Sequence, residues 1–191
     1  MGLRLAVACV YGDLIMRILY ATRPYEKVPG TCQQILDRWH DKIVHNVIHF
    51  NKKTFARNLK SIVEAFDNVE RTGEKKPKVG VVGEILVKYH PNANNDIVGI
   101  IESEGGEAVV LDFFLYGMYS KKFNYENLSG SYKQMMTNKA GIAAVEWLRK
   151  PMRKALRDSK HFTEPSYIQD TAQAASAISS IGNQCGEGWL L

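Results

Sequence analysis

Residues 78–94 read KVGVVGEILVKYHPNAN, and this stretch decides the fold class. It opens with β-branched residues between a proline and a glycine, namely Val79, Val81 and Val82. Such a run is typical of a short strand that is buried on both faces of a sheet. A polar segment, residues 84–94, follows at once. Because ligands of open α/β sheets bind outside the carboxyl ends of the strands, the stretch predicts both a strand and the position of a site.

A second strand is predicted a short distance downstream. Residues 95–104 carry isoleucines at helical spacing, and Gly105 and Gly106 are typical of a helix end. Residues 108–111 then form another apolar run before Asp112. Strand, helix and strand make one β-α-β unit with parallel strands. The sequence therefore predicts an α/β fold with a small, mainly parallel, Rossmann-like sheet flanked by helices.

The chain before this unit is predicted to be a helical layer. Apolar residues at helical spacing begin at residues 14–19, and Thr31 and Asn51 are candidate caps for two further helices. A short charged linker, residues 71–77, marks the change from helical to strand-like spacing. We therefore expect residues 1–72 to form a helical amino-terminal segment.

The chain after the unit is also expected to be helical. The pattern predicts helices at residues 131–150, 151–159 and 168–180, with Pro151 in the first turn of the second. The sequence stops on three large apolar residues, whereas chain ends are usually polar. We expect residues 73–191 to form a Rossmann-like α/β lobe that is incomplete at its carboxyl end, as in a piece of a longer protein.

Composition narrows the classes of partner. The chain has 191 residues, a formal net charge of +5 and an isoelectric point near 9.0. This charge suits anionic ligands such as phosphates but is far from that of a nucleic-acid-binding tail, so we expect no nucleic-acid partner. The three cysteines, Cys9, Cys32 and Cys185, form no CxxC pair. Such a sparse, odd set argues against a disulfide framework and for a reducing compartment.

The amino terminus bears on localisation. The first ten residues resemble a weak signal peptide, with Arg4 before a short apolar run. Residues 11–13 (Tyr-Gly-Asp) interrupt the run, and no small-residue cleavage site follows. On this pattern no apolar run reaches the roughly 18 residues that a membrane span needs. The sequence predicts a cytoplasmic protein with no membrane partner.

The polar segment after the first strand holds the candidate substrate-binding side chains, which are Glu84, Tyr89, His90, Asn92 and Asn94. Amides at a helix start can orient a carbonyl or a phosphate, and His90 can move a proton near neutral pH. The alternative is a structural loop in which the asparagines cap the next helix and His90 packs on Pro91. Both interpretations stay open, and we assign no catalytic residue.

Asp112 ends the second strand, where the ribose-binding acid of a dinucleotide site would lie. The glycine pattern G-x-G-x-x-G of such sites is missing from the turn after the first strand. We therefore favour a role for Asp112 as a cap of the strand end.

Basic residues recur at helical spacing near the end of the predicted 131–159 region, namely Arg149, Lys150, Arg153, Lys154, Arg157 and Lys160. They could hold the phosphates of an acyl carrier such as coenzyme A or contact an acidic partner. The commoner role of such a face is a solvated helix surface.

The segment 182–189 places three glycines around Cys185 and Glu187. Glycines let a backbone approach a ligand closely, so we add Glu187 to the substrate-binding set, with Cys185 close by. A lone cysteine is usually neither a metal ligand nor a nucleophile. The histidines near one helix face also lack a carboxylate at matching spacing, so we assign no metal site; they are His40, His45 and His49.

Three segments together carry a family resemblance. They are YGDLIMR leading to RPYE in residues 11–26, VGVVGEI with YHPNAN in residues 79–94, and GNQCGEGWLL in residues 182–191. With these motifs the chain resembles the carboxyl-terminal, dehydratase-like region of large proteins related to the 2-hydroxyacyl-CoA dehydratase activases. The resemblance covers nearly the whole chain.

The resemblance implies a lobe of an iron–sulfur component in anaerobic metabolism, acting on an acyl-CoA with an ATP-dependent activator. The related components hold a [4Fe-4S] cluster through cysteines near strand ends of Rossmann-like domains. In the family pattern the motif Phe-Gly-Cys-Leu-Pro-Asn-His follows Gly-Glu-Gly-Trp, and this chain ends before it, so no ligand role passes to Cys185. We expect a lobe that is inactive without the remainder of the protein or a partner subunit. The alternative is a noncatalytic nucleotide- or CoA-binding module, or a docking lobe.

Overall fold

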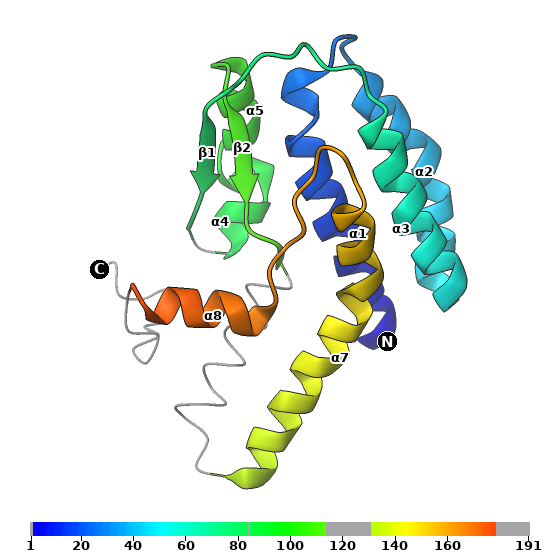
Figure 1. The fold of residues 1–191 in the computed structure, drawn as a ribbon, viewed down its shortest axis with the longest axis vertical. Helices are drawn as coiled ribbons and strands as arrows, with labels where there is room; N and C mark the ends of the chain where they lie inside the picture. Colours follow the sequence, from blue (N-terminus) through cyan, green and yellow to red (C-terminus); the bar gives the residue numbers. More distant parts are fainter. Residues whose placement is uncertain (1, 84, 114–130, 179–191) are drawn as a thin grey trace.

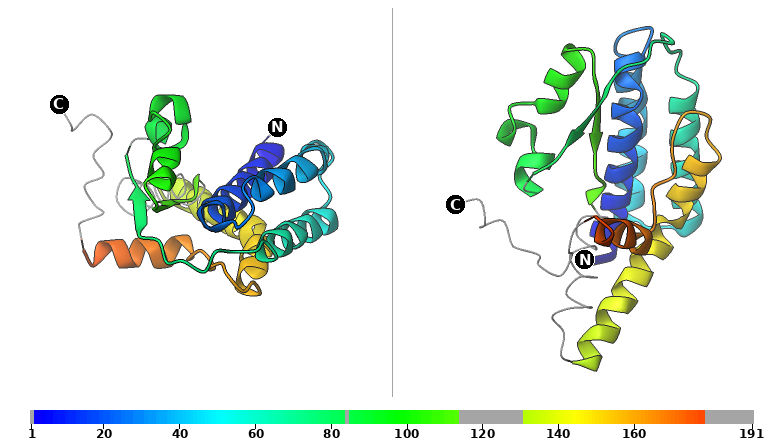
Figure 2. Two further views of the ribbon diagram at one scale, coloured as in Figure 1. Left: turned by 90° about the horizontal axis from the view of Figure 1, so that it is seen from above. Right: turned by 60° about the vertical axis from the view of Figure 1, so that its left-hand side comes forward.

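The computed structural model describes residues 2–83, 85–113 and 131–178, and Figure 1 shows their arrangement. In chain order the elements are α1 (Gly2–Tyr20), the 3-10 turn η1 (Arg23–Tyr25), α2 (Thr31–Ile48), α3 (Lys52–Asp67), β1 (Lys78–Val81), α4 (Ile85–Tyr89), the 3-10 turn η2 (Pro91–Ala93), α5 (Ile97–Ser103), β2 (Glu107–Val110), α7 (Tyr132–Arg157) and α8 (Ile168–Ser176). The strands lie between α5 and α1, and α2 and α3 pack beyond α1 (Figure 2).

The main core joins α1, α2, α3 and the second half of α7. Its fully buried side chains include Val10, Leu14, Ile18, Phe55, Leu59, Phe66, Met152 and Leu156. The core residues from α3, Phe55, Leu59 and Phe66, repeat at helical spacing and so lie on one face of the helix. Asn51 caps α3 as expected, because its Oδ1 accepts a hydrogen bond from the Thr54 N–H at 3.0 Å.

The start of α2 is capped by a side chain that the sequence pattern missed. We expected Thr31 to be the N-cap, but it is the first helical residue and its hydroxyl donates to the Val28 carbonyl. The Glu26 carboxylate instead accepts from the N–H groups of Gly30 at 2.8 Å and Cys32 at 2.9 Å. A carboxylate at this position also complements the positive end of the helix dipole.

Helix α1 runs without a break through residues 11–13, which interrupt the apolar run in the sequence but not the helix. Tyr11 and Asp13 are both buried and have partners elsewhere in the fold. The Tyr11 hydroxyl donates to Asn46 Oδ1 at 2.8 Å, and Asp13 Oδ1 accepts from the Phe113 N–H at 2.7 Å. Polar groups with such partners can lie inside a core helix without cost to its continuity.

The continuous helix α1 also bears on whether the chain contains a possible membrane span. Among the described residues, the segment Gly2–Tyr25 is long and apolar enough to cross a bilayer by length and composition. Our expectation that no apolar run is long enough is therefore wrong. Within its most apolar window, 39% is buried inside the protein. A buried core helix and a signal sequence pass the same test, so the cytoplasmic location stays a prediction.

The two strands are parallel, with Lys78 opposite Glu107 and Val81 opposite Val110. This confirms the predicted β-α-β unit and a mixed helix–sheet fold. Helix α5 covers one face through Val98 and Ile101, which pack with Val81, Ala108 and Val110. Gly105, at φ 84°, ends α5 as predicted, since the left-handed conformation suits glycine.

The connection between the strands differs from the prediction in two respects. We expected an open loop over residues 84–94, but residues 85–89 form helix α4. Asn95 and Asp96 then adopt positive φ angles of 56° and 51°, so α5 begins at Ile97 rather than at residue 95. The left-handed conformation is tolerated best by Asn and Asp among non-glycine residues.

Helix α7 is a single helix from Tyr132 to Arg157, so the predicted boundary at Pro151 is wrong. A proline inside a helix removes one backbone hydrogen bond and costs about 3 kcal/mol. Leu148 and Met152, on either side of it, are both buried in the main core. Tertiary packing of the flanking turns therefore outweighs the local preference for a break.

Candidate functional site

Tyr89, one of the predicted site residues, lies at the carboxyl end of β2. Its hydroxyl donates to the carbonyl of Leu111, the residue after β2, at 2.6 Å. Its ring also contacts Phe113 edge-on, with ring centroids 5.5 Å apart. Tyr89 thus ties α4 to the carboxyl end of β2 and helps to shape the position at which the sequence predicts a ligand.

The other predicted residues that the structure describes are His90, Asn92 and Asn94. Asn94 has a structural role, because its Nδ2 donates to the Val87 carbonyl at 2.8 Å and its Oδ1 accepts from the Ile97 N–H at 3.2 Å. His90 and Asn92 are exposed to solvent. Glu84, Cys185 and Glu187 lie outside the described residues. The capping alternative therefore holds for Asn94, and the role of the exposed pair stays a prediction.

Single substitutions should separate these two kinds of residue. Asn94→Ala removes the cap of α5 and the bond to Val87, and we expect it to lower the free energy of unfolding by about 1 kcal/mol. His90→Ala changes an exposed side chain, and we expect a change within about 0.5 kcal/mol. Urea unfolding followed by circular dichroism measures both. Equal losses for the two variants would contradict this assignment.

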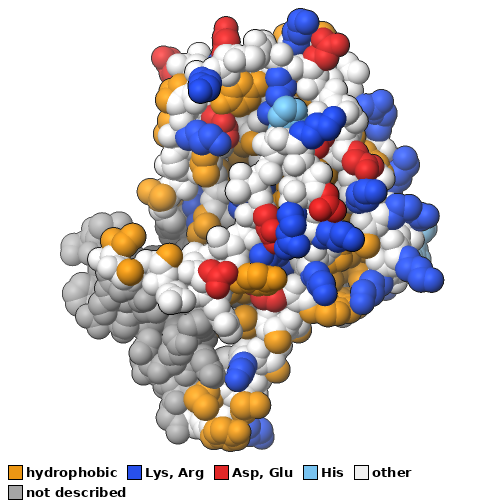
Figure 3. Space-filling model, in the orientation of Figure 1, with side chains coloured by type: hydrophobic (Ala, Val, Ile, Leu, Met, Phe, Trp, Pro, Cys, Tyr) orange, Lys and Arg blue, Asp and Glu red, His pale blue; other side chains and the backbone are white. Residues whose placement is uncertain are grey.

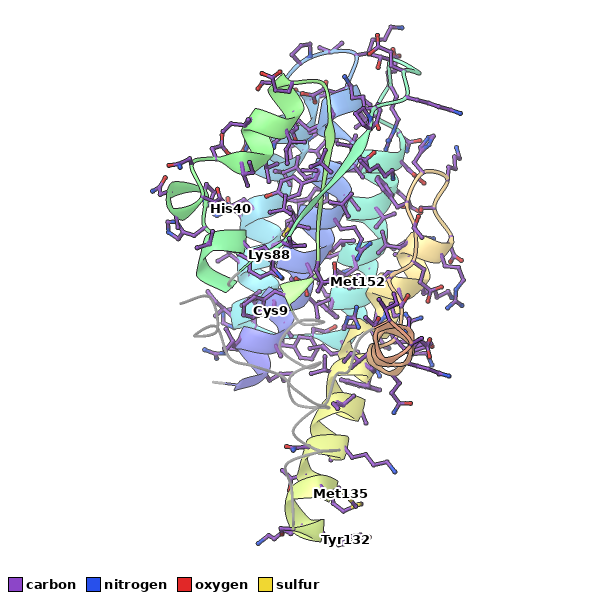
Figure 4. All side chains as sticks on the ribbon, turned by 90° about the vertical axis from the view of Figure 1, so that its left-hand side faces the viewer. Cys9, His40, Lys88, Tyr132, Met135 and Met152 are labelled. Atoms are coloured by element: carbon purple, nitrogen blue, oxygen red, sulfur yellow. The ribbon has the colours of Figure 1, made fainter. Side chains whose placement is uncertain are left out.

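Lys88 is a residue near the strand ends that the sequence reasoning missed. It lies on α4 and is almost fully buried (Figure 4). Its ammonium group is 4.7 Å from the centre of the Tyr89 ring. Burial lowers the pKa of Lys88 below its ordinary value. A lysine with a lowered pKa is a candidate proton donor or acceptor, because its neutral form becomes accessible nearer to neutral pH.

Asp112 forms the centre of a buried charge cluster at the carboxyl end of β2. Its Oδ1 accepts from Arg17 Nη2 at 2.8 Å and its Oδ2 from Arg149 Nη2 at 3.3 Å. The side chains of Asp112 and Arg149 are both 0% exposed. Both carboxylate oxygens are therefore engaged by guanidinium groups from α1 and α7. This supports the strand-end role of Asp112 over a ribose-binding one.

The cluster continues along α7 to the segment before α8. Glu146 accepts from Arg149 at 3.1 Å and from the Ile168 N–H at 2.9 Å. Glu164 accepts from Arg153 Nε at 2.9 Å and from Arg157 Nε at 2.7 Å. These arginines, Arg157 first, lower the pKa of Glu164 to about 2. The carboxylates hold α7, β2 and the segment before α8 in one arrangement.

This cluster overturns part of the expectation for the basic helix face. Arg149, Arg153 and Arg157 are paired with internal carboxylates rather than turned toward a phosphate. Arg149 and Arg153 are buried, whereas Arg157 and the lysines of the set, Lys150, Lys154 and Lys160, are exposed. Helical spacing places residues on a face but does not say whether that face is buried.

The segment 11–26 braces the β-α-β unit. Asp13 and Arg17 make the contacts described above. In addition, the Arg23 guanidinium donates two hydrogen bonds to the Glu102 carboxylate of α5, at 2.7 and 3.0 Å. The Tyr25 hydroxyl donates to Glu107 Oε2 at 2.7 Å. The motif residues near the amino terminus thus contact both the beginning and the end of β2 as well as α5.

A small hollow of about 100 Å³ runs beside β2, between α1 and residues 161–163. Arg17, Lys78 and His161 line it together with Glu107 and the apolar Val109. The volume suits a few waters or one phosphate-sized anion. None of the predicted site residues that the structure describes lines this hollow.

The described cysteines and histidines do not form a metal site. Cys9 is half-buried and Cys32 is buried, and burial together with the nearby Glu26 carboxylate raises the pKa of Cys32 to about 12. A thiol with a raised pKa is a poor nucleophile and a poor metal ligand at neutral pH. Within residues 2–83, 85–113 and 131–178 no three His, Cys, Asp or Glu side chains are grouped to hold a metal ion.

Comparisons of the chain with protein-family models, with curated proteins and with solved structures found no match.

Proposed function

We propose that this chain is a Rossmann-like α/β lobe of an iron–sulfur component related to the 2-hydroxyacyl-CoA dehydratases. On this proposal it contributes to an acyl-CoA site and does not catalyse alone, because the cysteine motif of the family is not among its residues. The remainder of such a protein or a partner subunit, with an ATP-dependent activator, would complete the system.

One observation carries the proposal. Two of the segments that bear the resemblance, residues 11–26 and 79–94, are far apart in the sequence but meet around one β-α-β unit. Arg17 reaches Asp112 at the end of β2, and Tyr89 reaches the neighbouring Leu111 carbonyl. Motifs that meet at the carboxyl ends of parallel strands are typical of a ligand site in α/β proteins.

The test is a thermal-shift titration of the full chain with a 2-hydroxyacyl-CoA, free CoA, ADP and inorganic phosphate. We expect the acyl-CoA to raise the melting temperature with concentration, since binding at about a hundred times Kd stabilises by about 2.7 kcal/mol. His90→Ala should weaken this shift, whereas Lys139→Ala, on the exposed face of α7, should leave it unchanged. No shift with either CoA compound would overturn the proposal.

Anaerobic incubation with iron and sulfide tests the cluster separately. We expect the chain alone to stay colourless, because the ligand motif of the family is not among its residues. A brown protein with visible absorbance would show that the chain itself supplies the ligands, and would contradict the proposed division of roles.

A second candidate is a noncatalytic module for nucleotides or free CoA. The hollow beside β2 favours it, since the basic side chains of Arg17 and Lys78 line it. Stabilisation by ADP and phosphate, without a difference between acyl-CoA and free CoA, would support this candidate.

A further inference from the structure

The outer edge of β1 carries backbone groups that have no partner among the described residues. The Pro77 carbonyl accepts from the Glu107 N–H at 2.8 Å, so it faces β2. Backbone groups alternate in direction along a strand, which turns those of Val79 toward β2 and those of Lys78 and Gly80 away from it. The strand order is β1–β2, with no further strand beside β1 in the described part of the chain (Figure 1).

Apolar side chains surround this edge. Val79 is 41% exposed and Val82, just after β1, is 87% exposed. Val109 of β2 is also exposed. Hydrophobic side chains reach the surface on the side of the molecule where the strands lie (Figure 3). Parallel strands are normally covered on both faces and flanked by further strands. The exposed apolar side chains here are therefore of the kind that is usually buried in the interior of a protein.

The amino end of the same edge is basic. Lys75 is exposed, and the Lys78 side chain is largely exposed while it contacts Glu107 at 3.1 Å. Lys76 lies between them and contacts Glu74 at 3.8 Å. The edge thus combines unpaired backbone groups, apolar side chains and a positive end.

We propose that the outer edge of β1 docks a β-strand of a separate partner protein. The strand runs parallel to β1, carries apolar residues at alternate positions, and begins with acidic residues that lie against Lys75 and Lys78. Backbone hydrogen bonds to Lys78 and Gly80 provide the pairing, and the exposed valines provide the apolar contact. The inference uses only the edge itself and does not depend on the proposed function.

A synthetic peptide, Asp-Glu-Glu-Val-Thr-Val-Thr-Ile with a fluorescent label, serves as the probe for the full chain. We expect saturable binding by fluorescence anisotropy. Residue-resolved hydrogen exchange should slow about tenfold at the amides of Lys78 and Gly80 when the peptide is at about ten times its Kd. The amides of Val79 and Val81, already turned toward β2, should change little.

Three controls make the test decisive. A peptide with N-methyl groups at alternate positions should not bind, and one that begins with three lysines should bind about threefold or more weakly at low salt. Lys75→Glu should weaken binding of the acidic peptide, and Lys139→Glu on α7 should not. No binding, equal binding of the N-methyl peptide, or protection away from β1 would each overturn the proposal. So would a dimer of the chain that protects the same amides without peptide.

Discussion

Asp112→Ala should lower the free energy of unfolding by about 3–5 kcal/mol, the largest effect that we expect from one substitution. The carboxylate is fully buried and pairs with Arg17 and with the fully buried Arg149. Its removal leaves the buried Arg149 charge paired with Glu146 but without its second carboxylate partner, and the loss of a partner from a buried charge is far more costly than the loss of a surface ion pair. Urea unfolding followed by circular dichroism measures the loss.

Two further variants define the cause. Asp41→Ala removes an exposed carboxylate on α2 and should change the free energy of unfolding by no more than about 0.5 kcal/mol. Adding Arg149→Met to Asp112→Ala should recover part of the lost free energy of unfolding, because the buried guanidinium charge is then removed. A loss below about 1 kcal/mol for Asp112→Ala would mean that the two arginines find other partners.

Tyr11→Phe should lower the free energy of unfolding by about 1–3 kcal/mol. The Tyr11 hydroxyl donates to Asn46 at 2.8 Å and accepts from Asn58 Nδ2 at 3.2 Å, and all three residues are buried. Without the hydroxyl, both asparagines lose a partner in a place that water does not reach. Tyr132→Phe is the matched control, since Tyr132 is largely exposed and should tolerate the change.

The same hydroxyl predicts a pH dependence. Burial raises the pKa of Tyr11 from 10.0 to about 12. Its contribution to stability is therefore complete below pH 10 and is lost as the pH rises toward 12, because the unfolded chain releases the proton first. Tyr11→Phe should unfold with a shallower pH dependence in this range. An unchanged slope would show that another group, such as Cys32, governs alkaline unfolding.

The chain shows why some site residues are readable from sequence and others are not. Asn94 was a candidate because asparagines at helix starts either cap or bind ligands, and only the distances to Val87 and Ile97 identify it as a cap. Lys88 gave no pattern, because its lowered pKa comes from burial, which depends on neighbours brought together by folding. His90 is a candidate by residue type alone, and the thermal-shift titration with acyl-CoA tests its role.

The sequence by itself determined the β-α-β unit, the cap at Asn51 and the end of α5 at Gly105. Each depends on residues within a few positions of one another, so local patterns contain the information. Only the tertiary structure decided that Pro151 lies inside a continuous helix and that Arg149 is buried against Asp112. These outcomes are set by partners many residues away, whose packing and charge outweigh the preferences of the local chain.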